Sequence, residues 1–389
     1  MNAISHATLA LDARRSGSTA DRSWSRSVRV PEVSKVSRDD YVNLAKYLAA
    51  FPEDQSQSTQ SWLSRIRAWW DLNPAFEDSF ARGWLLRDDG KIVGFLGSIP
   101  RKFQLRGNET TVFAGTTWRV LPEFRGMSVA LKLRQMDEHG DVLHFSTTPT
   151  AEVARLLELL GYATFCRGSR DGDHSAIFLN FEKVLRARLQ DATLGDMLAK
   201  RLAPVLGAIQ TCFIRNLKHC GHSDVRVLER AGKEFDDLWK RTRSRYANTA
   251  IRTADAINWY CFSSKVFEKT LFGYFEGHRL VGYMVFLSTE KRGMKFFECV
   301  DAWIEPVSNQ TQVRGALVEK ARQYAEQGSF DRMFLPHFDR DAAASYARLG
   351  LISMRSWGKP GFLRGPRHVM DQIMTAPSYF VLAEGDYGL

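Results

Sequence analysis

The spacing of apolar residues predicts two helices near the start of the chain, between Val33 and Trp70. Apolar side chains recur there every three or four residues, which places them on one face of a helix. These side chains are Tyr41, Leu44 and Leu48 in the first helix and Trp62, Ile66, Trp69 and Trp70 in the second. Each helix therefore has an apolar face to bury, and the pattern that follows is that of a sheet.

Strand patterns follow the two helices. Gly83–Leu86 and Ile92–Ile99 flank the Asp89-Gly90 pair, which supplies the positive backbone angles of a tight hairpin turn. Two more strands are predicted, at Lys102–Leu105 and at Thr111–Val120, with a turn at residues 107 and 108 between them. This region is therefore expected to form an antiparallel meander.

Helices and strands alternate after the meander. A loop at Leu121–Met127 leads into a predicted helix at Ser128–His139 and an apolar strand at Val142–Ser146. A second helix, Ala151–Leu160, is expected to end at Gly161, since glycine is the usual residue after a helix C-terminus. The order of elements is helix, antiparallel meander, then strand, helix, strand, helix.

The same order returns in the second part of the chain. Leu280–Tyr283 repeats the pattern of the earlier hairpin, and a strand at Phe296–Ile304 and a helix at Thr311–Gln327 follow it. A strand at Met333–Phe338 and a helix at Ala342–Leu349 complete the repeat. A repeat of this length predicts duplicated domains rather than a solenoid.

A basic helical segment joins the two copies. Its leucines recur at loosely helical intervals, and they are Leu185, Leu189, Leu194, Leu198 and Leu202. Its basic residues include Arg186, Arg188, Lys200 and Arg201. The segment is expected to pack across two domains, and the alternative is a position on a membrane surface.

A length of 389 residues also favours two domains, because single cores stop growing below this size. The predicted fold class is α+β, with two tandem domains that each hold a mixed, mostly antiparallel sheet flanked by helices. The expected ranges are 1–30 for a disordered leader, 31–180 for the first domain, 181–222 for the helical connector and 223–389 for the second domain. The Arg- and Ser-rich leader also faintly resembles an organelle transit peptide.

The formal charge of +10 and the pI of 9.4 indicate either a polyanionic partner or a basic solvated surface. No nucleic-acid partner is expected, because no recognition helix or aromatic sheet motif is present. The five cysteines lack CxxC spacing, so no metal site is predicted and free thiols are expected. No apolar run reaches the roughly 20 residues of a membrane span, and the protein is interpreted as cytoplasmic.

Candidate chemistry lies in the loop before the helix at Ser128. A loop that opens a helix presents unpaired N–H groups and the positive end of the helix dipole, which together stabilise a pyrophosphate. Gly126, Ser128 and Ala130 are small enough to let a phosphate approach, and Arg125 adds a permanent positive charge.

This loop resembles the coenzyme A loop of the GNAT acetyltransferases, which reads Arg or Gln, two residues, Gly, one residue, then Gly or Ala. Arg125 and Ala130 match the pattern, and Ser128 stands where the family usually has glycine. The resemblance implies an acetyl-CoA or other acyl-CoA cofactor. It further implies that the backbone of Trp118, Arg119 and Val120 pairs with the pantetheine arm. The pyrophosphate would then be cradled by the N–H groups of Gly126, Met127, Ser128, Val129 and Ala130.

The second copy keeps the elements without the loop. Glu305–Thr311 has no glycine and no basic first residue, so only the first copy is expected to bind the cofactor. Tyr346 matches the position of the tyrosine that protonates the departing thiolate in the family, where the first copy has Leu157. The candidate proton carriers are therefore His144, Asp301 and Tyr346, and each has an alternative role in packing or ion pairing.

The resemblance implies an N-acyltransferase in which a primary amine of a small molecule or amino sugar attacks the thioester directly. The alternatives are an aminoacyl or long-chain acyl transferase, and a non-catalytic acyl-CoA-binding or scaffold protein. Tyr379–Asp386 is interpreted as a final strand with an acidic tail. Together with the two copies, this segment is similar to tandem GNAT proteins of bacterial cell-surface polysaccharide synthesis. The oligomeric state stays open.

Overall fold

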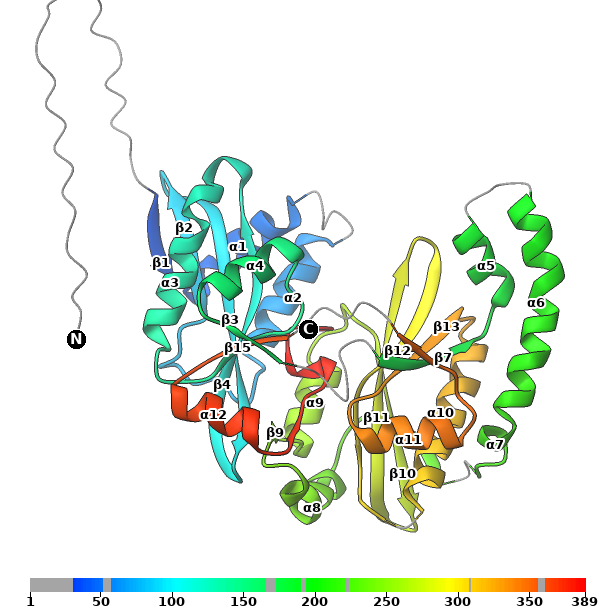
Figure 1. Cartoon of the computed structure of the whole chain (residues 1–389). Coiled ribbons are helices and arrows are strands. Elements are labelled where there is room, and N and C mark those ends of the chain that lie inside the picture. Colours follow the sequence, from blue (N-terminus) through cyan, green and yellow to red (C-terminus); the bar gives the residue numbers. More distant parts are fainter. Residues whose placement is uncertain are drawn as a thin grey trace, which may run out of the picture.

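The computed structural model describes residues 31–51, 57–165, 173–189, 194–221, 224–307, 309–355 and 361–389. The leader predicted at residues 1–30 lies outside these ranges. The described chain forms two mixed sheets that stand side by side, each flanked by helices (Figure 1). This architecture confirms the predicted fold class. No helix in the described ranges has the length and apolar character needed to cross a membrane.

The elements of the first part follow the predicted order. They are β1 (Glu32–Lys35), α1 (Tyr41–Ala49), α2 (Thr59–Trp69), β2 (Gly83–Asp88), β3 (Lys91–Leu105), β4 (Asn108–Val120), η3 (Pro122–Met127), α3 (Ser128–Glu138), β5 (His144–Ser146), α4 (Ala151–Leu159), β6 (Ala163–Phe165) and β7 (Asp173–Phe178). The connector holds α5 (Phe181–Leu189), α6 (Leu194–Phe213) and α7 (Arg215–Lys218).

The second part repeats this order and then adds a C-terminal segment. Its elements are β8 (Val225–Leu228), α8 (Lys233–Thr242), β9 (Asn248–Ala250), α9 (Ala254–Phe262), β10 (Lys269–Glu276), β11 (Arg279–Lys291), β12 (Met294–Ile304), α10 (Gln310–Gln327), β13 (Arg332–Pro336), α11 (Arg340–Arg348), β14 (Ser353–Arg355), β15 (Gly361–Arg364), α12 (Arg367–Thr375) and β16 (Ser378–Tyr379).

One strand is longer than the sequence predicted. The separate strands expected at Ile92–Ile99 and Lys102–Leu105 form the single strand β3, which continues through Pro100. Proline is tolerated there because Pro100 and Phe113 form a non-hydrogen-bonded pair. The Phe113 N–H points away from β3 and donates to Leu143, so the ladder needs no N–H from Pro100. The prediction of a break was therefore wrong, since it assumed that proline ends the ladder.

The two sheets exchange strands across the expected domain bounds. The first sheet has the order β1-β2-β3-β4-β5-β15-β6, so β15 from the second part lies between β5 and β6. The second sheet has the order β14-β7-β13-β12-β11-β10-β8, so β7 from the first part lies between β14 and β13. In addition, β9 pairs with β3 and β16 pairs with β9. Each sheet is thus completed by the other half of the chain.

The C-terminal segment after β16 runs between the two sheets (Figure 1). A single apolar core continues across this junction and includes Phe103, Trp259 and Phe380. The Trp259 indole donates to the carbonyl of Ala68 at 2.6 Å, which joins α9 to α2. The acidic tail predicted for this segment is wrong in part, because Glu384 is buried and pairs with Arg252 at 3.3 Å.

The connector does not pack across the two sheets as expected. Gln210 of α6 bonds the backbone of Phe178 at 2.9 and 2.8 Å, which fixes the inner side of this helix beside β7. The outer side stays exposed at the margin of the second half (Figure 1). The expectation that the connector packs across two domains was wrong, because the strand exchange and the C-terminal segment join the two halves.

Candidate functional site

Strands β4 and β5 separate soon after they begin to pair. They are in register only at Phe113 with His144 and at Ala114 with Phe145. Beyond Ala114, residues 115–120 of β4 have no strand partner on this side. We call the divergence between residues 115–120 and residues 146–148 the wedge, and its closed end at Ala114 and Phe145 the vertex. Backbone groups along the wedge are available to pair with an extended ligand.

A bulge in β4 opens the wedge. The register between β3 and β4 shifts between Phe95 and Gly97, so two β4 residues oppose one residue of β3. Thr117 lies in this bulge with a φ of 50°. A β-branched residue rarely adopts a positive φ, and such strained positions concentrate at binding and catalytic sites.

The predicted coenzyme A loop lies at the open end of the wedge. Trp118, Arg119 and Val120 form the end of β4, and residues 122–127 form the short helix η3 that leads into α3. No side chain caps the N-terminus of α3, and the Ser128 N–H donates to the carbonyl of Arg125 in η3. Arg125 and Gly126 are exposed, and a Cβ added to Gly126 would meet nothing within 4 Å. These features suit a phosphate group at this helix end.

One side of the vertex is lined by buried polar groups from α3 and its neighbours. A Cβ added to Gly115, the first β4 residue past the vertex, would lie 3.8 Å from Lys132 Nζ and 3.9 Å from the Gln135 amide. Lys132 Nζ donates to Gln135 Oε1 at 2.6 Å and lies 4.7 Å from the centre of the Tyr162 ring. Burial lowers the pKa of Lys132 to about 7, and the nearby Arg364 contributes to this shift.

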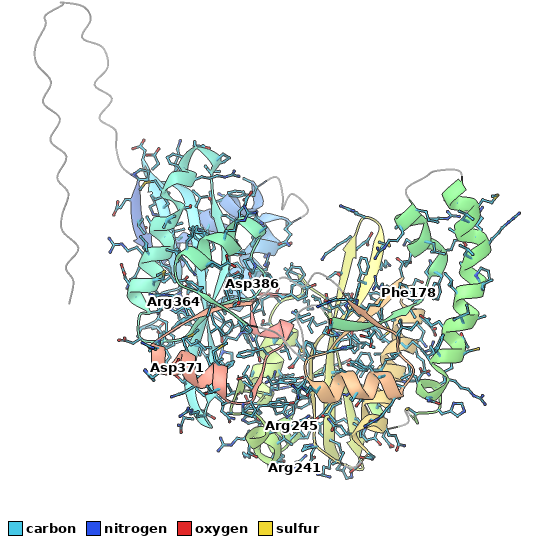
Figure 2. All side chains as sticks on the ribbon, in the orientation of Figure 1. Phe178, Arg241, Arg245, Arg364, Asp371 and Asp386 are labelled. Carbon is cyan, nitrogen blue, oxygen red and sulfur yellow. The ribbon has the colours of Figure 1, made fainter. Side chains whose placement is uncertain are left out.

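A carboxylate lies on the opposite side of the vertex. Gly115 faces Lys132 on one side of β4. The side chain of the next residue, Thr116, points to the other side, because successive strand residues alternate between faces. Thr116 donates to Asp386 Oδ2 at 2.8 Å, and Thr148 donates to Asp386 Oδ1 at 3.1 Å. Figure 2 labels Asp386 on the C-terminal segment between the sheets. Sequence reasoning missed Asp386, although the acidic residues near the C-terminus were noticed.

The backbone fixes Asp386 in this position. Arg101 is buried in β3 and donates to the carbonyl of Gly385 at 2.6 Å. A Cβ added to Gly385 would lie 1.7 Å from Thr147 Oγ1, so only glycine permits this approach. The C-terminal segment therefore reaches the wedge directly, and its carboxylate is held by two threonines.

The structure does not bring the three predicted proton carriers together. His144 on β5 is buried near the vertex, where burial lowers its pKa well below the usual value. Asp301 on β12 accepts from Tyr283 at 2.8 Å and pairs with Arg252 at 3.3 Å. Tyr346 on α11 is fully buried beneath the second sheet. Only His144 lies beside the wedge, and the roles of all three stay predictions.

The corresponding place in the second sheet is occupied by protein. β12 pairs with β13 only at residues 296–298 and then diverges, as β4 does from β5. The Tyr379 hydroxyl from the C-terminal segment fills this divergence and donates to the carbonyl of Ala302. The loop before α10 begins with Glu305, which pairs with Arg241 and Arg279. An acidic loop and a filled divergence both disfavour a phosphate ligand there.

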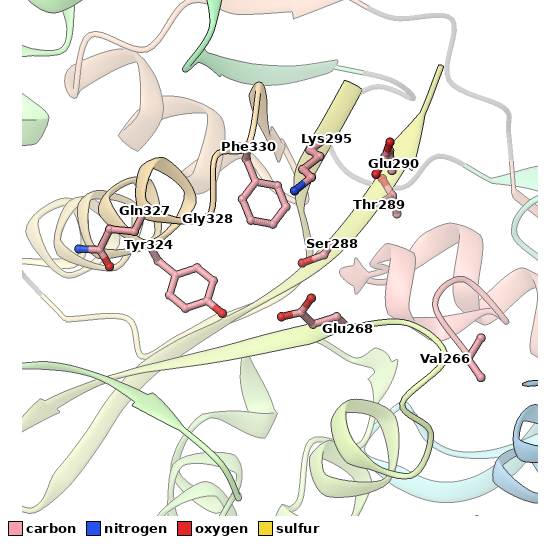
Figure 3. A pocket seen from close by; sticks show the side chains of 10 residues that line it. All are labelled: Val266, Glu268, Ser288, Thr289, Glu290, Lys295, Tyr324, Gln327, Gly328 and Phe330. Carbon is pink, nitrogen blue, oxygen red and sulfur yellow. The ribbon is translucent and has the colours of Figure 1, made fainter. Parts of the chain in front are cut away.

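A cavity of about 570 Å³ lies elsewhere in the second half (Figure 3). Its lining includes Glu268, just before β10, Ser288 of β11, Lys295 of β12 and Tyr324 of α10. It lies at the β12 end opposite the loop before α10, and none of its lining residues belongs to the wedge. Among the described residues, no cluster of three or more His, Cys, Asp or Glu side chains is placed to hold a metal ion.

The fold is similar to that of solved N-acyltransferases. A GCN5-related N-acetyltransferase from Anabaena variabilis shares 11% identity, with 86% of this chain and 72% of that chain covered and a TM-score of 0.53. N-myristoyltransferase from Saccharomyces cerevisiae with bound myristoyl-CoA shares 14% identity, with 86% and 78% covered and a TM-score of 0.51. A probable N-acyltransferase from Enterococcus faecalis shares 10% identity, with 86% and 73% covered and a TM-score of 0.52.

No protein-family model matches the chain, and no curated protein matches it. At identities of 10–14% the structural similarity establishes the fold, a GNAT-like one, and not the substrate.

Proposed function

We propose that this chain is an acyl-CoA-dependent N-acyltransferase whose first half holds the cofactor. The observation that carries the proposal is the wedge. It runs from its closed vertex, which has a carboxylate on one side, to its open end at the N-terminus of α3. The pyrophosphate would bind residues 126–130 and Arg125, and the pantetheine arm would pair with residues 118–120. The thioester would then lie near the vertex, with the acceptor amine on the side of Asp386.

The chemistry requires a base for the amine. The amine nitrogen attacks the thioester carbonyl, a C–N bond forms, and the C–S bond breaks as the coenzyme A thiolate leaves. Asp386 is positioned to accept the proton that the nitrogen loses, because it sits at the vertex and is partly exposed. Alignment of the two reactants supplies about 7–11 kcal/mol of the barrier reduction, so a single well-placed base is sufficient.

The acceptor in this proposal is a primary amine of a small molecule or an amino sugar. The reaction is proposed to take place in the cytoplasm. A role in cell-surface polysaccharide synthesis and an origin of the two halves by duplication belong to the same proposal. The second candidate function is transfer of a long acyl chain. Its support is the similarity of the fold to the yeast N-myristoyltransferase structures with bound myristoyl-CoA. The buried polar side chains beside the vertex disfavour a long hydrocarbon chain at this place.

The cofactor proposal is tested by calorimetric titration with acetyl-CoA and longer acyl-CoAs. Arg125→Glu should abolish saturable binding, because the charge reverses at the helix end that receives the pyrophosphate. Arg134→Glu is the matched control, since Arg134 is an exposed arginine further along α3. Unchanged affinity in Arg125→Glu would refute the loop assignment.

The role of Asp386 is tested by thiol release from acetyl-CoA over a panel of amines. Asp386→Asn should lower kcat by about 10²- to 10⁴-fold and leave cofactor affinity unchanged, because only the proton acceptor is removed. Asp371→Asn is the control, since Asp371 lies exposed on α12 (Figure 2). A full rate in Asp386→Asn would exclude it as the base, and turnover of no amine by the native protein would favour a binding protein.

A further inference from the structure

Several buried polar atoms on the α3 side of the vertex have no hydrogen-bond partner. They belong to different elements that converge on one place, and they are Trp118 Nε1, Gln135 Nε2, His144 Nδ1 and Tyr162 OH. Three of these groups are hydrogen-bond donors, and Lys132 Nζ adds more donor capacity to the same cluster. Buried donors are rarely left unpaired in folded proteins, so this group points to a ligand with several acceptor atoms.

The same cluster carries positive charge without a matching carboxylate. Lys132 is only 3% exposed, and neither Lys132 nor Arg364 forms an ion pair within the described part of the chain. The titratable groups that face Lys132 are Arg364 from β15, His144 from β5, His139 after α3 and Tyr162 after α4. Each of them is basic or neutral. A buried cation of this kind is stable only when an anion accompanies it or when it loses its proton.

We propose that this cluster, defined by Trp118, Lys132, Gln135, Tyr162 and Arg364, binds the acyl group of the donor, and that the acyl group ends in a carboxylate. The donor class is therefore a dicarboxylic acyl-CoA, such as succinyl-CoA or malonyl-CoA. This inference rests on the proposed function, because it places the thioester at the vertex. A carboxylate would accept from Lys132 and Tyr162 together, in charge-assisted bonds that a hydrocarbon chain cannot form.

Binding of such a donor must also move a proton. Burial lowers the pKa of Lys132 to about 7 in the free protein, so this side chain is mostly neutral at pH 8. A carboxylate placed beside it favours the ammonium form. The donor should therefore bind with uptake of a proton at pH 8, which appears as a heat that depends on the ionisation enthalpy of the buffer.

The test compares succinyl-CoA with pentanoyl-CoA by calorimetry at pH 8 in two buffers. The pentanoyl chain has the same number of non-hydrogen atoms along its length as the succinyl chain and lacks the carboxylate. Succinyl-CoA should bind the native protein about tenfold tighter or more, with proton uptake that pentanoyl-CoA lacks. Lys132→Met should remove both the preference and the uptake and leave pentanoyl-CoA affinity unchanged. Lys91→Met, at an exposed lysine on β3, should change neither.

Three results are informative in different ways. Equal affinities for the two donors in the native protein would overturn the inference and leave the proposed function intact. An equal loss for both donors in Lys132→Met would overturn it as well, because Lys132 would then serve the coenzyme A part. Binding of neither donor would refute the proposed function, and the inference with it.

A second observation concerns the exposed side of α6. Five apolar side chains spaced at helical intervals form a stripe along this helix, and they are Leu198 (36% exposed), Leu202 (44%), Val205 (54%), Ile209 (45%) and Phe213 (56%). A continuous apolar stripe on one helix face is normally buried. Here the opposite side of α6 already packs on α5 and β7.

We infer that the α6 stripe docks on an anionic lipid surface. α6 itself carries Lys200 and Arg201 against Asp196 among its described residues. The neighbouring helices α5 and α7 add Arg188, Arg215 and Lys218, whereas Lys183 pairs with Asp331 and Arg186 pairs with Glu182 and Asp196. Basic side chains around an apolar face are typical of helices that lie in a membrane interface. Negative headgroups complement this charge, whereas a second copy of the same basic helices would repel it.

Sedimentation with vesicles tests this inference on the whole protein. Vesicles with phosphatidylglycerol should carry the protein down, vesicles of phosphatidylcholine alone should do so at least tenfold less, and Leu202→Ser with Ile209→Ser should abolish binding. The substituted residues are exposed, so folding is preserved. No sedimentation with either vesicle would overturn the inference. Loss of self-association in the double variant would do the same, because the stripe would then bind a second copy.

Discussion

Lys132 provides a direct test of the structural reasoning, because its buried ammonium has no anion beside it. Folding lowers the pKa of Lys132 from 10.5 to about 7. The unfolded chain therefore binds a proton at Lys132 between these two pH values that the folded chain has released. The free energy of unfolding should rise with pH across this window, since stability rises wherever the unfolded state holds more protons.

The magnitude follows from the same pKa values. At pH 7 the lowered pKa corresponds to a cost of about 4 kcal/mol, and at pH 10 to less than about 1 kcal/mol. Lys132→Met removes this cost and keeps the length of the side chain. It also removes the bond to Gln135, which is worth about 1 kcal/mol. The variant should therefore be about 3 kcal/mol more stable than the native protein at pH 7, and about equal to it at pH 10.

Denaturant unfolding at the two pH values, without acyl-CoA, measures this difference. Lys91→Met is the control, and its stability should stay within about 0.5 kcal/mol of the native value at both pH values because Lys91 is exposed. A loss of stability in Lys132→Met at pH 7 would refute the reasoning. A stability gain that does not vary with pH would also contradict it, since the ammonium would then not be the cause.

Three further predictions concern the C-terminal segment and the bulge. Native stability should fall as pH rises from about 4.5 to about 8, because burial raises the Glu384 pKa to about 7, and Glu384→Gln should remove this dependence in denaturation experiments across the same range. Gly385→Ala should cost about 1–3 kcal/mol and abolish turnover, because its Cβ collides with Thr147, whereas Gly221→Ala, in open space, should be neutral. Thr117→Gly should raise the denaturation midpoint by an amount worth about 1 kcal/mol if the φ of 50° stores strain; a lower midpoint would show that no strain is relieved.

The sequence predicted the parts of the site that depend on local order. The strand, loop and helix from Thr111 to His139 were recognisable because apolar period, turn residues and the small residues of the loop all lie within one stretch of chain. The structure has β4, η3 and α3 at these positions. The predicted range of β3 failed at Pro100, where the partner's hydrogen bond goes elsewhere.

The parts that depend on distant contacts were not predictable in this way. Asp386 meets Thr116 across 270 positions of sequence, and no local pattern marks that contact. Lys132 is an ordinary lysine in a helix by its neighbours in sequence, and only its position against Gly115 shows that it is buried. Lys132 has no carboxylate beside it because of how α3, α4 and β15 pack together. This packing cannot be predicted from the local sequence.

The strand exchange gives the second half a role in a site that it does not contain. β15 enters the first sheet beside β5, and its register places Arg364 opposite His144 at the vertex. The C-terminal segment then returns between the sheets and brings Asp386 to the other side of β4. The second half thus supplies a cation to one side of the wedge and a carboxylate to the other, although its own divergence is filled by Tyr379. The two sides of the wedge therefore depend on contacts that only the complete chain can form.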